Sequence, residues 1–345
     1  MNLEATQARE NISPPQATGD RDVLGDSLRM YGRGCLSYTT RQRPFDHFVT
    51  PHGYLPYYRF ANRLLSRGPI HIVVGDPISR PSQFRAIISE FLKLAKPVIF
   101  LQAGEAFAGV LDELGLTVNR FGIETELELP KFDLKGKHKA HLRHWINTAA
   151  KAGVEPFECD LESMSEAEVQ RLSSEWLKRK GGKEMALLTR PFEYRRQRDV
   201  RFFWARRDGE LLAMVTFDPI YVDGSIHGYY QDLVRCKEGA PNGTPDLVAS
   251  KAIETFKLEG HRVLAIGVSP LSSLAEEPFH CSKLIRRIFE FLYAHGNFVY
   301  SFKGLEFHKK HYRGNERSVY VASSSRNTAL LLRDLIAILL TLQVF

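Results

Sequence analysis

The spacing of hydrophobic residues predicts strands and helices that alternate along most of the chain. Residues 54–60, 70–74 and 98–101 are short apolar runs typical of buried strands. Between the last two runs, the apolar residues of 81–95 recur at intervals of three and four, as they do on one face of a helix. This alternation predicts an α/β fold, with some α+β character, in which helices lie on a sheet.

A similar pattern returns after Gly153. Strands are expected at residues 154–159, 201–205 and 211–218, and the Asp-Gly pair at 208–209 is typical of a hairpin turn between the last two. Helices are expected near residues 165–178 and 282–294. The two halves of the chain therefore share a plan of helices on a twisted sheet. This plan indicates a duplicated unit, although no repeat is visible residue by residue.

Two further segments are also predicted to be strands. Residues 36–40 read LSYTT, and residues 299–302 read VYSF and lead into Lys303-Gly304-Leu305. Both runs are rich in the β-branched and aromatic residues that favour strands. The chain then ends in an apolar helix from Ala329, which either packs on the domain or lies on a membrane surface.

Residues 229–272 form the succession with the clearest chemical content. A strand that carries Asp232 and Arg235 leads into a Pro-Asn-Gly-Thr turn, a helix, and an apolar strand that stops at Ser269-Pro270. The free N–H groups and positive dipole end of such a helix favour an anion or a carbonyl oxygen. Because the next strand ends on the same side, we expect these residues, the turn and the Ser269 loop to form one site.

Length and composition favour a soluble globular chain with two domains. The chain has 345 residues, of which 43% are hydrophobic and 25% charged. Its four cysteines are far apart and no group of His, Cys and acidic residues has ligand spacing, so reduced thiols and no metal are expected. No secretory signal or membrane-spanning segment is visible, which predicts a cytoplasmic protein.

The positive charge is concentrated in two segments. The formal net charge is +7, and residues 178–208 alone carry eleven Lys and Arg against four Asp and Glu. Residues 131–151 carry six Lys and Arg against one acid, and from about Lys137 they can form a helix with its basic residues mainly on one face. Such concentration favours contact with a polyanion such as nucleic acid. A solvated linker helix is the alternative for residues 137–151.

Several short motifs from Gly34 to Ala322 carry a family resemblance. In the first half they are Gly75-Asp76-Pro77, Leu142-Arg143, and Ser174-Glu175-Trp176-Leu177 with Lys180; in the second half they are Asp232-Leu233-x-Arg235, Pro241-Asn242-Gly243-Thr244 with Asp246, Ser269-Pro270-Leu271-Ser272, and Phe302-Lys303-Gly304-Leu305 with Lys309. In their order and spacing these motifs resemble the catalytic part of phosphatidylglycerol lysyltransferases, the aminoacyl-phosphatidylglycerol synthases that use aminoacyl-tRNA.

The resemblance implies two tandem GNAT-like acyltransferase domains. We expect a disordered segment at 1–28, a first domain at 29–136, a basic linker helix at 137–152, a catalytic domain at 153–327 and an apolar helix at 328–345. The sequence contains no counterpart of the many-helix flippase module of full-length members, so a stand-alone member is expected. The resemblance further implies aminoacyl-tRNA as cosubstrate and no other cofactor. For the location, peripheral contact at the inner face of the membrane is an alternative to a purely cytoplasmic protein.

The resemblance also assigns roles to individual residues. The expected catalytic residues are Asp232, Arg235 and Lys303. The expected substrate-binding residues are Tyr229, Asn242, Gly243, Thr244, Asp246, Ser269, Trp176 and Lys180, and those expected to contact tRNA are Lys135, Lys137, Lys139, Arg143 and Lys309. Asp232 is a candidate base or the group that holds the ammonium of the amino acid, whereas Arg235 would stabilise an oxyanion or a phosphate.

Each assignment has a structural alternative. Asp232 and Arg235 could form an ion pair, Lys303 could be a solvated lysine, Asp246 could be a first-turn acid that complements the helix dipole, and aromatic residues in strands usually pack in the core. The Asn-Gly turn is also common before helices.

Four functions remain open from the sequence. The first is transfer of an amino acid from tRNA to a hydroxyl of phosphatidylglycerol or another lipid, and the second is the same chemistry on a small hydroxylamine or natural-product acceptor. A CoA-dependent acetyltransferase of the same fold is disfavoured, because the segment that would bind pyrophosphate reads Gly239-Ala-Pro-Asn-Gly243. A non-catalytic module that binds RNA or membranes would explain the charge equally well.

Overall fold

Twelve strands form one sheet in the part of the chain that the structure describes. The computed structural model describes residues 22–180, 187–274, 278–296 and 300–342. The strands are β1 (Asp46–Thr50), β2 (Gly53–Phe60), β3 (Ile70–Val74), β4 (Ile78–Ser79), β5 (Val98–Gly104), β6 (Thr117–Glu128), β7 (Glu155–Glu158), β8 (Arg201–Arg207), β9 (Glu210–Val222), β10 (Ser225–Cys236), β11 (Val263–Pro270) and β12 (Asn315–Ser323).

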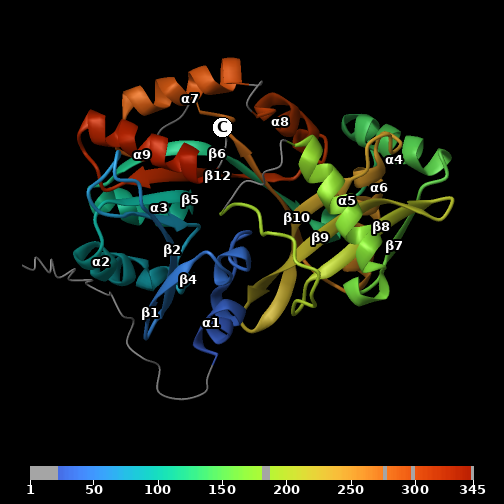
Figure 1. Cartoon of the computed structure of the whole chain (residues 1–345), viewed down its shortest axis with the longest axis horizontal. Helices are drawn as coiled ribbons and strands as arrows, with labels where there is room; N and C mark the ends of the chain where they lie inside the picture. The colour runs from blue at the N-terminus through green and yellow to red at the C-terminus, as the bar shows by residue number, and fades with distance from the viewer. Residues whose placement is uncertain (1–21, 181–186, 275–277, 297–299, 343–345) are drawn as a thin grey trace, which may run out of the picture.

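Helices cover both faces of this sheet (Figure 1). They are α1 (Val23–Tyr31), α2 (Phe84–Leu94), α3 (Glu105–Glu113), α4 (Ala140–Lys151), α5 (Glu166–Arg179), α6 (Thr244–Leu258), α7 (Lys283–His295), α8 (Phe302–Lys310) and α9 (Thr328–Thr341). No described helix is long and apolar enough to cross a membrane. Instead, α9 buries Leu331, Ala337 and Ile338 in a core that it shares with α7 and the sheet.

The two halves of the chain repeat one topology. In the first half, β1, β2 and β3 are antiparallel, and β5 returns parallel to β3 after α2. In the second half, β8, β9 and β10 are antiparallel, and β11 returns parallel to β10 after α6. This arrangement confirms the α/β class and the duplicated plan that hydrophobic spacing predicts.

The halves are joined by an exchange of strands. The order β1-β2-β3-β5-β12-β6-β11-β10-β9-β8-β7 places β12, from the end of the chain, beside β5 of the first half. In return, β6 of the first half lies between β12 and β11. The predicted domain boundaries stay a prediction, and the sheet runs continuously across them because each half contributes a strand to the other.

Two predicted strands are wrong. Residues 36–40 form turns and lead into a short 3-10 helix at Thr39–Arg41, because Ser37 and Thr40 make hydrogen bonds to nearby backbone groups that compete with a strand ladder. Residues 302–310 form α8, and residues 297–299 lie outside the described part. A run of four residues is too short to distinguish a strand from the start of a helix.

The expected disorder of residues 1–28 is wrong from Val23 onward. Residues 1–21 lie outside the described part of the chain. Residues from Val23 form α1, in which Leu28 is buried against Tyr38 and Tyr221.

Gly243 is required where α4 meets the start of α6. It is the N-cap of α6 and has a φ of 86°, in the left-handed region. A Cβ at this position would lie 2.1 Å from the carbonyl oxygen of Trp145 in α4. Gly239, four residues earlier, has a similar φ of 75° but no heavy atom within 4 Å of the corresponding point.

Gly243→Ala and Gly239→Ala should therefore differ in stability. Both place an L-residue at positive φ, which costs about 1–2 kcal/mol. Only Gly243→Ala also forces a backbone clash, for which overpacking costs about 1–3 kcal/mol more. Urea unfolding of the two variants measures the difference in free energy of unfolding. Equal losses would contradict the close packing of α4 against this turn.

Candidate functional site

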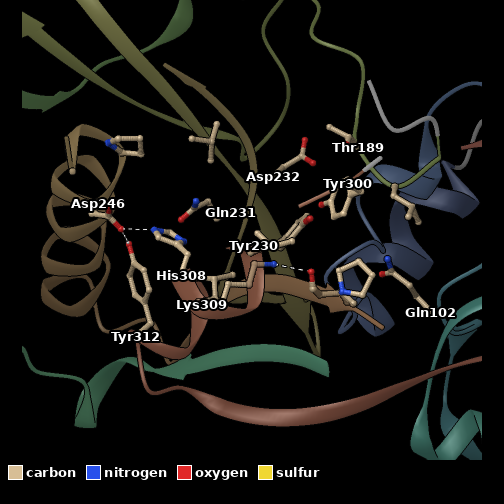
Figure 2. A pocket seen from close by; sticks show the side chains of 18 of the residues that line it. Gln102, Thr189, Tyr230, Gln231, Asp232, Asp246, Tyr300, His308, Lys309 and Tyr312 are labelled. Atoms are coloured by element: carbon tan, nitrogen blue, oxygen red, sulfur yellow. Dashed lines mark hydrogen bonds and ion pairs between the residues drawn. The ribbon is translucent and has the colours of Figure 1, made fainter. Parts of the chain in front are cut away.

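A cavity of about 460 Å³ opens where β10 and β11 separate. The two parallel strands pair only over three positions, Gly228–Tyr230 with Val263–Ala265. Beyond these positions β10 continues along β9 and β11 continues along β6, so a gap forms between them. The N-terminus of α6, one side of α8 and residues 188–189 close the gap (Figure 2).

The cavity wall combines residues from distant parts of the sequence. It is lined by Gln102, Leu188, Thr189, Tyr230, Gln231, Asp232, Val234, Asn242, Gly243, Pro245, Asp246, Ile266, Val268, Pro270, Tyr300, Leu305, His308, Lys309 and Tyr312. Four of the predicted site residues, Asp232, Asn242, Gly243 and Asp246, are therefore brought together. Lys309, predicted to contact tRNA, lies in the same wall.

A bulge in β10 places Asp232 in the wall. The register between β10 and β9 shifts between Gln231 and Val234, where one extra residue is inserted in β10. The side chain of Asp232 is fully buried, with Arg190 Nε at 3.5 Å. Within the described residues, neither carboxylate oxygen accepts a well-formed hydrogen bond.

Arg190 lies between two buried carboxylates. Its Nη2 lies 2.6 Å from Asp218 Oδ1 and its Nε lies 3.3 Å from Asp218 Oδ2, so Asp218 is its closer carboxylate partner. Burial, followed by repulsion from Asp218, raises the pKa of Asp232 well above its usual range, although Arg190 opposes the shift. Burial also raises the pKa of Asp218, but its closer contacts with Arg190 favour the ionised form, so the protonated form is favoured at Asp232 rather than at Asp218.

Lys309 extends from α8 into the same cavity. Its Nζ donates a hydrogen bond of 2.9 Å to the carbonyl oxygen of Val268, beyond the last position at which β11 pairs with β10. Burial lowers the pKa of Lys309 to about 7, while Cys35 and Glu124 favour its charged form. A substantial fraction of this lysine is therefore a neutral amine near pH 7.

Asp246, in the first turn of α6, joins α6 to α8. Its Oδ1 lies 2.8 Å from His308 Nε2 and accepts a hydrogen bond of 2.8 Å from the hydroxyl of Tyr312, as Figure 2 shows. Asp246 is thus more than a first-turn acid, because it fixes two aromatic rings at one end of the cavity.

A second cavity, which is apolar, adjoins the first. Its thirteen lining residues are apolar or aromatic and come mainly from α7, α9 and the 270–271 turn, among them Phe289, Leu292, Ile338 and Leu339. Leu188, Pro270 and Tyr300 line both cavities. The apolar cavity has a volume of about 70 Å³, so it is much smaller than the polar one.

Arg235 and Lys303 lie elsewhere. Arg235 is buried with its guanidinium 4.0 Å from the ring centroid of Trp176, outside the residues that line the cavity, and burial lowers its pKa to about 10. No ion pair joins Arg235 to Asp232 among the described residues, because Asp232 faces Arg190 instead. Lys303 is exposed in the first turn of α8, where its Nζ donates to the carbonyl oxygen of Ala294, and not at a strand end as expected.

The other predicted substrate-binding residues also lie outside the cavity wall. Tyr229 stacks on Phe256 with ring centroids 4.3 Å apart, as a core residue does. Thr244 Oγ1 donates to the carbonyl oxygen of Pro241, and the carbonyl oxygen of Ser269 accepts from Ser272. Lys180 Nζ lies 5.8 Å from the ring of Trp176 on α5.

The expected tRNA-contacting residues divide into two kinds. Lys135 and Lys137 are exposed. Lys139 Nζ lies 3.7 Å from the ring centroid of Phe132 and donates to the carbonyl oxygen of Asp133, while Arg143 donates to the carbonyl oxygens of Leu134 and Gly136. Lys139 and Arg143 therefore also hold the loop before α4 in place.

Comparison with known proteins places these features in a family. Residues 47–323 match the family described as phosphatidylglycerol lysyltransferase, C-terminal. The chain belongs to this family. It is 28% identical over 272 residues to the phosphatidylglycerol lysyltransferase of Bacillus subtilis (strain 168), an alignment that covers 76% of this chain and 31% of the relative. The chain thus spans about a third of the length of the curated relatives it matches.

Two solved structures share the fold of this chain. The structure of L-PGS from Bacillus licheniformis has a TM-score of 0.73 and 22% identity, and the alignment covers 92% of this chain and 95% of that one. The C-terminal domain of a putative lysylphosphatidylglycerol synthetase from Agrobacterium fabrum also has a TM-score of 0.73, with 20% identity and the same coverage. These matches confirm the predicted fold class.

The motifs shared with the lysyltransferase family did not reveal the whole cavity. Arg190, Asp218, His308 and Tyr312 are missed because they come from three segments that are far apart in the sequence, with only His308 and Tyr312 close together. Arg190 belongs to the basic segment 178–208, whose charge predicts residues at the surface. The one available signal is the spacing of His308 and Tyr312, which puts both on the side of the α8 segment that also carries Leu305.

Arg190→Met should destabilise the protein, and more so at pH 7 than at pH 5. Removing the cation of a buried ion pair costs about 3–5 kcal/mol. In the variant, both carboxyl groups have raised folded-state pKa values, so the loss is greatest where the unfolded carboxylates are ionised and shrinks as pH falls. Denaturant unfolding at both pH values measures this. Arg195→Met, at a side chain that is 64% exposed, is the control and should change stability by less than about 0.5 kcal/mol.

Proposed function

We propose that this chain transfers an aminoacyl group from aminoacyl-tRNA to a hydroxyl of phosphatidylglycerol. The observation that carries the proposal is the polar cavity between β10 and β11, with Asp232 and Lys309 in its wall and an apolar cavity beside it. The names of the relatives, phosphatidylglycerol lysyltransferases, support lipid aminoacylation. These names do not specify the donor, and aminoacyl-tRNA as donor is part of our proposal.

The pair of cavities favours a lipid acceptor over a small polar one. A phosphatidylglycerol molecule has a glycerol hydroxyl at one end and acyl chains at the other. With the hydroxyl near Lys309, a short segment of one acyl chain would enter the apolar cavity between α7 and α9, which has a volume of about 70 Å³, past the shared residues Leu188, Pro270 and Tyr300. Burial of apolar chain surface would then supply binding energy.

The N-terminus of α6 favours an ester at the other side. Asn242 and Gly243 line the cavity just before the first turn of α6, where the positive end of the helix dipole favours negative charge. A tetrahedral intermediate of acyl transfer carries such a charge on its oxygen. We assign this turn to the ester carbonyl, which agrees with its expected role in substrate binding.

Lys309 is the group best suited to accept the proton of the acceptor hydroxyl. An amine with a pKa of about 7 is neutral in part at physiological pH, and its hydrogen bond to Val268 leaves a lone pair available. Asp232, which keeps a proton, is a poor base. We therefore assign Asp232 to the ammonium of the aminoacyl group, whose positive charge would favour loss of that proton.

Transfer of labelled lysine from lysyl-tRNA to vesicles that contain phosphatidylglycerol tests the role of Lys309. Lys309→Met and Lys309→Arg should each lower kcat/KM by about 10²–10⁴-fold, the usual contribution of a general base. The arginine variant keeps a cation but has no neutral form. Lys251→Met, at an exposed lysine of α6, is the control. Activity in Lys309→Arg equal to that of the unaltered protein would show that a cation suffices and would refute the base.

The pH dependence gives a second measure of the same assignment. Because the neutral amine is the active form, kcat/KM should rise with pH through a midpoint of about 7 and then level off. Spontaneous hydrolysis of lysyl-tRNA, measured without protein, is subtracted at each pH. A flat profile from pH 6 to 8 would contradict a proton acceptor with this pKa.

The identity of the acceptor is tested by comparing acceptors with and without acyl chains, and by one substitution in the apolar cavity. Phosphatidylglycerol with long acyl chains should be used with higher kcat/KM than glycerol phosphate, because only the lipid fills the apolar cavity. Leu339→Glu should raise KM for the lipid, whereas Leu258→Glu, at a side chain that is 89% exposed on α6, should not. Equal use of both acceptors by the unaltered protein would favour a small-molecule acceptor.

A further inference from the structure

Five rings from α4 and α8 form a cluster beside the cavity. His141, Trp145, Phe307, His308 and His311 are here called the ring platform. His311 contacts three of the others, with ring centroids 5.0 Å from His141, 5.1 Å from Trp145 and 4.4 Å from Phe307. His308 stacks on Trp145 at 5.6 Å with 23° between the ring planes.

The ring platform is continuous with the wall of the cavity. His308 belongs to both, since it lines the cavity and bonds to Asp246 through Nε2. The carbonyl oxygen of Trp145 lies directly against Gly243, which lines the cavity mouth. From His308 and Trp145 the platform extends outward to His311, Phe307 and His141.

Its outer part faces solvent. Phe307 is 56% exposed, and His141 is exposed. Most of the large aromatic side chains in the cores are by contrast almost completely buried, for example Phe107, Phe203 and Phe256. An exposed set of rings at the rim of a cavity is a surface for a flat ligand.

The surroundings of the platform are basic. Exposed Lys137 precedes α4, and exposed Lys310, which pairs with Glu306, lies on α8 next to Lys309. Flat rings beside cations are the arrangement that proteins use for unpaired nucleotides, in which bases stack on aromatic side chains and lysines contact the phosphates.

We propose that the ring platform stacks the unpaired bases at the 3′ end of the tRNA, which rests on the proposed function above. The ester bond of aminoacyl-tRNA is on the terminal ribose, so the terminal base must lie next to the cavity when the ester lies inside it. His308 and Trp145 occupy this place. Phe307, His311 and His141 continue the surface outward for the preceding base.

The test uses an unacylated RNA hairpin that ends in an unpaired CCA-3′ sequence. Its Kd is compared, by fluorescence anisotropy, with that of the same hairpin in which the nucleotide before the 3′-terminal one is abasic, because this is the base assigned to Phe307 and His311. Stacking of one base predicts that the abasic hairpin binds about tenfold more weakly. Phe307→Ala and His311→Ala should weaken binding of the intact hairpin by a similar factor and leave binding of the abasic hairpin nearly unchanged.

The chain supplies a matched control. Phe291 and His295 form the same pair four residues apart on α7, with ring centroids 4.9 Å apart and Phe291 64% exposed, and neither lines the cavity. Phe291→Ala should leave both Kd values unchanged. Phe307→Trp, which keeps a ring, should keep the binding that Phe307→Ala loses.

The outcomes separate this proposal from the proposed function. If the unaltered protein binds the intact and abasic hairpins equally, or if Phe307→Ala weakens both equally, an RNA donor remains supported and the stacking role is wrong. If it binds neither hairpin at low salt, the RNA donor itself is wrong, and the platform proposal falls with it.

Discussion

The separation of β10 from β11 is the constraint on which the rest of the site depends. Two parallel strands that pair over only three positions leave backbone groups of both strands beside a gap. The strands remain ordered because each has another neighbour, β9 for β10 and β6 for β11. Lys309 then bonds to the carbonyl oxygen of Val268 in the separated part of β11. The feature that opens the cavity is thus also the one that holds its lysine.

The exchange of strands between the halves allows β10 and β11 to separate without breaking the sheet. Because β6 and β12 cross between the halves, β11 stays paired with β6 in a continuous sheet even where it does not pair with β10. One core, which contains residues such as Ile72 and Ile99 of the first half and Ala265 of the second, spans the junction. The first half therefore supports the site mainly as a rigid neighbour, and Gln102 of β5 is its one residue in the described cavity wall.

Local pattern predicts the elements well and the site only in part. The hairpin at Asp208-Gly209 and the helix after Gly243 follow from residues adjacent in sequence, and both are found. Asp232, Asn242, Gly243 and Asp246 could be placed near one another because they flank one strand and one helix. Arg190 could not be placed near them from the sequence, because its burial depends on Asp218 of β9, twenty-eight residues away. Arg235 lies outside the wall because, two residues beyond the extra residue in β10, it packs on Trp176 instead.

Charge counted along the chain is a poor guide to charge on the surface. Residues 178–208 hold an excess of basic residues equal to the net charge of the whole protein, yet Arg190 is buried between Asp218 and Asp232. Arg201 binds Glu158 and Glu259, and Arg206 binds Glu168. Three basic residues of this segment thus support the β8 to β10 region from within, because ion pairs between segments satisfy buried or half-buried cations. Among its described residues, the positive charge that this segment does expose comes from Lys178, Arg179, Lys180, Arg195, Arg196 and Arg198.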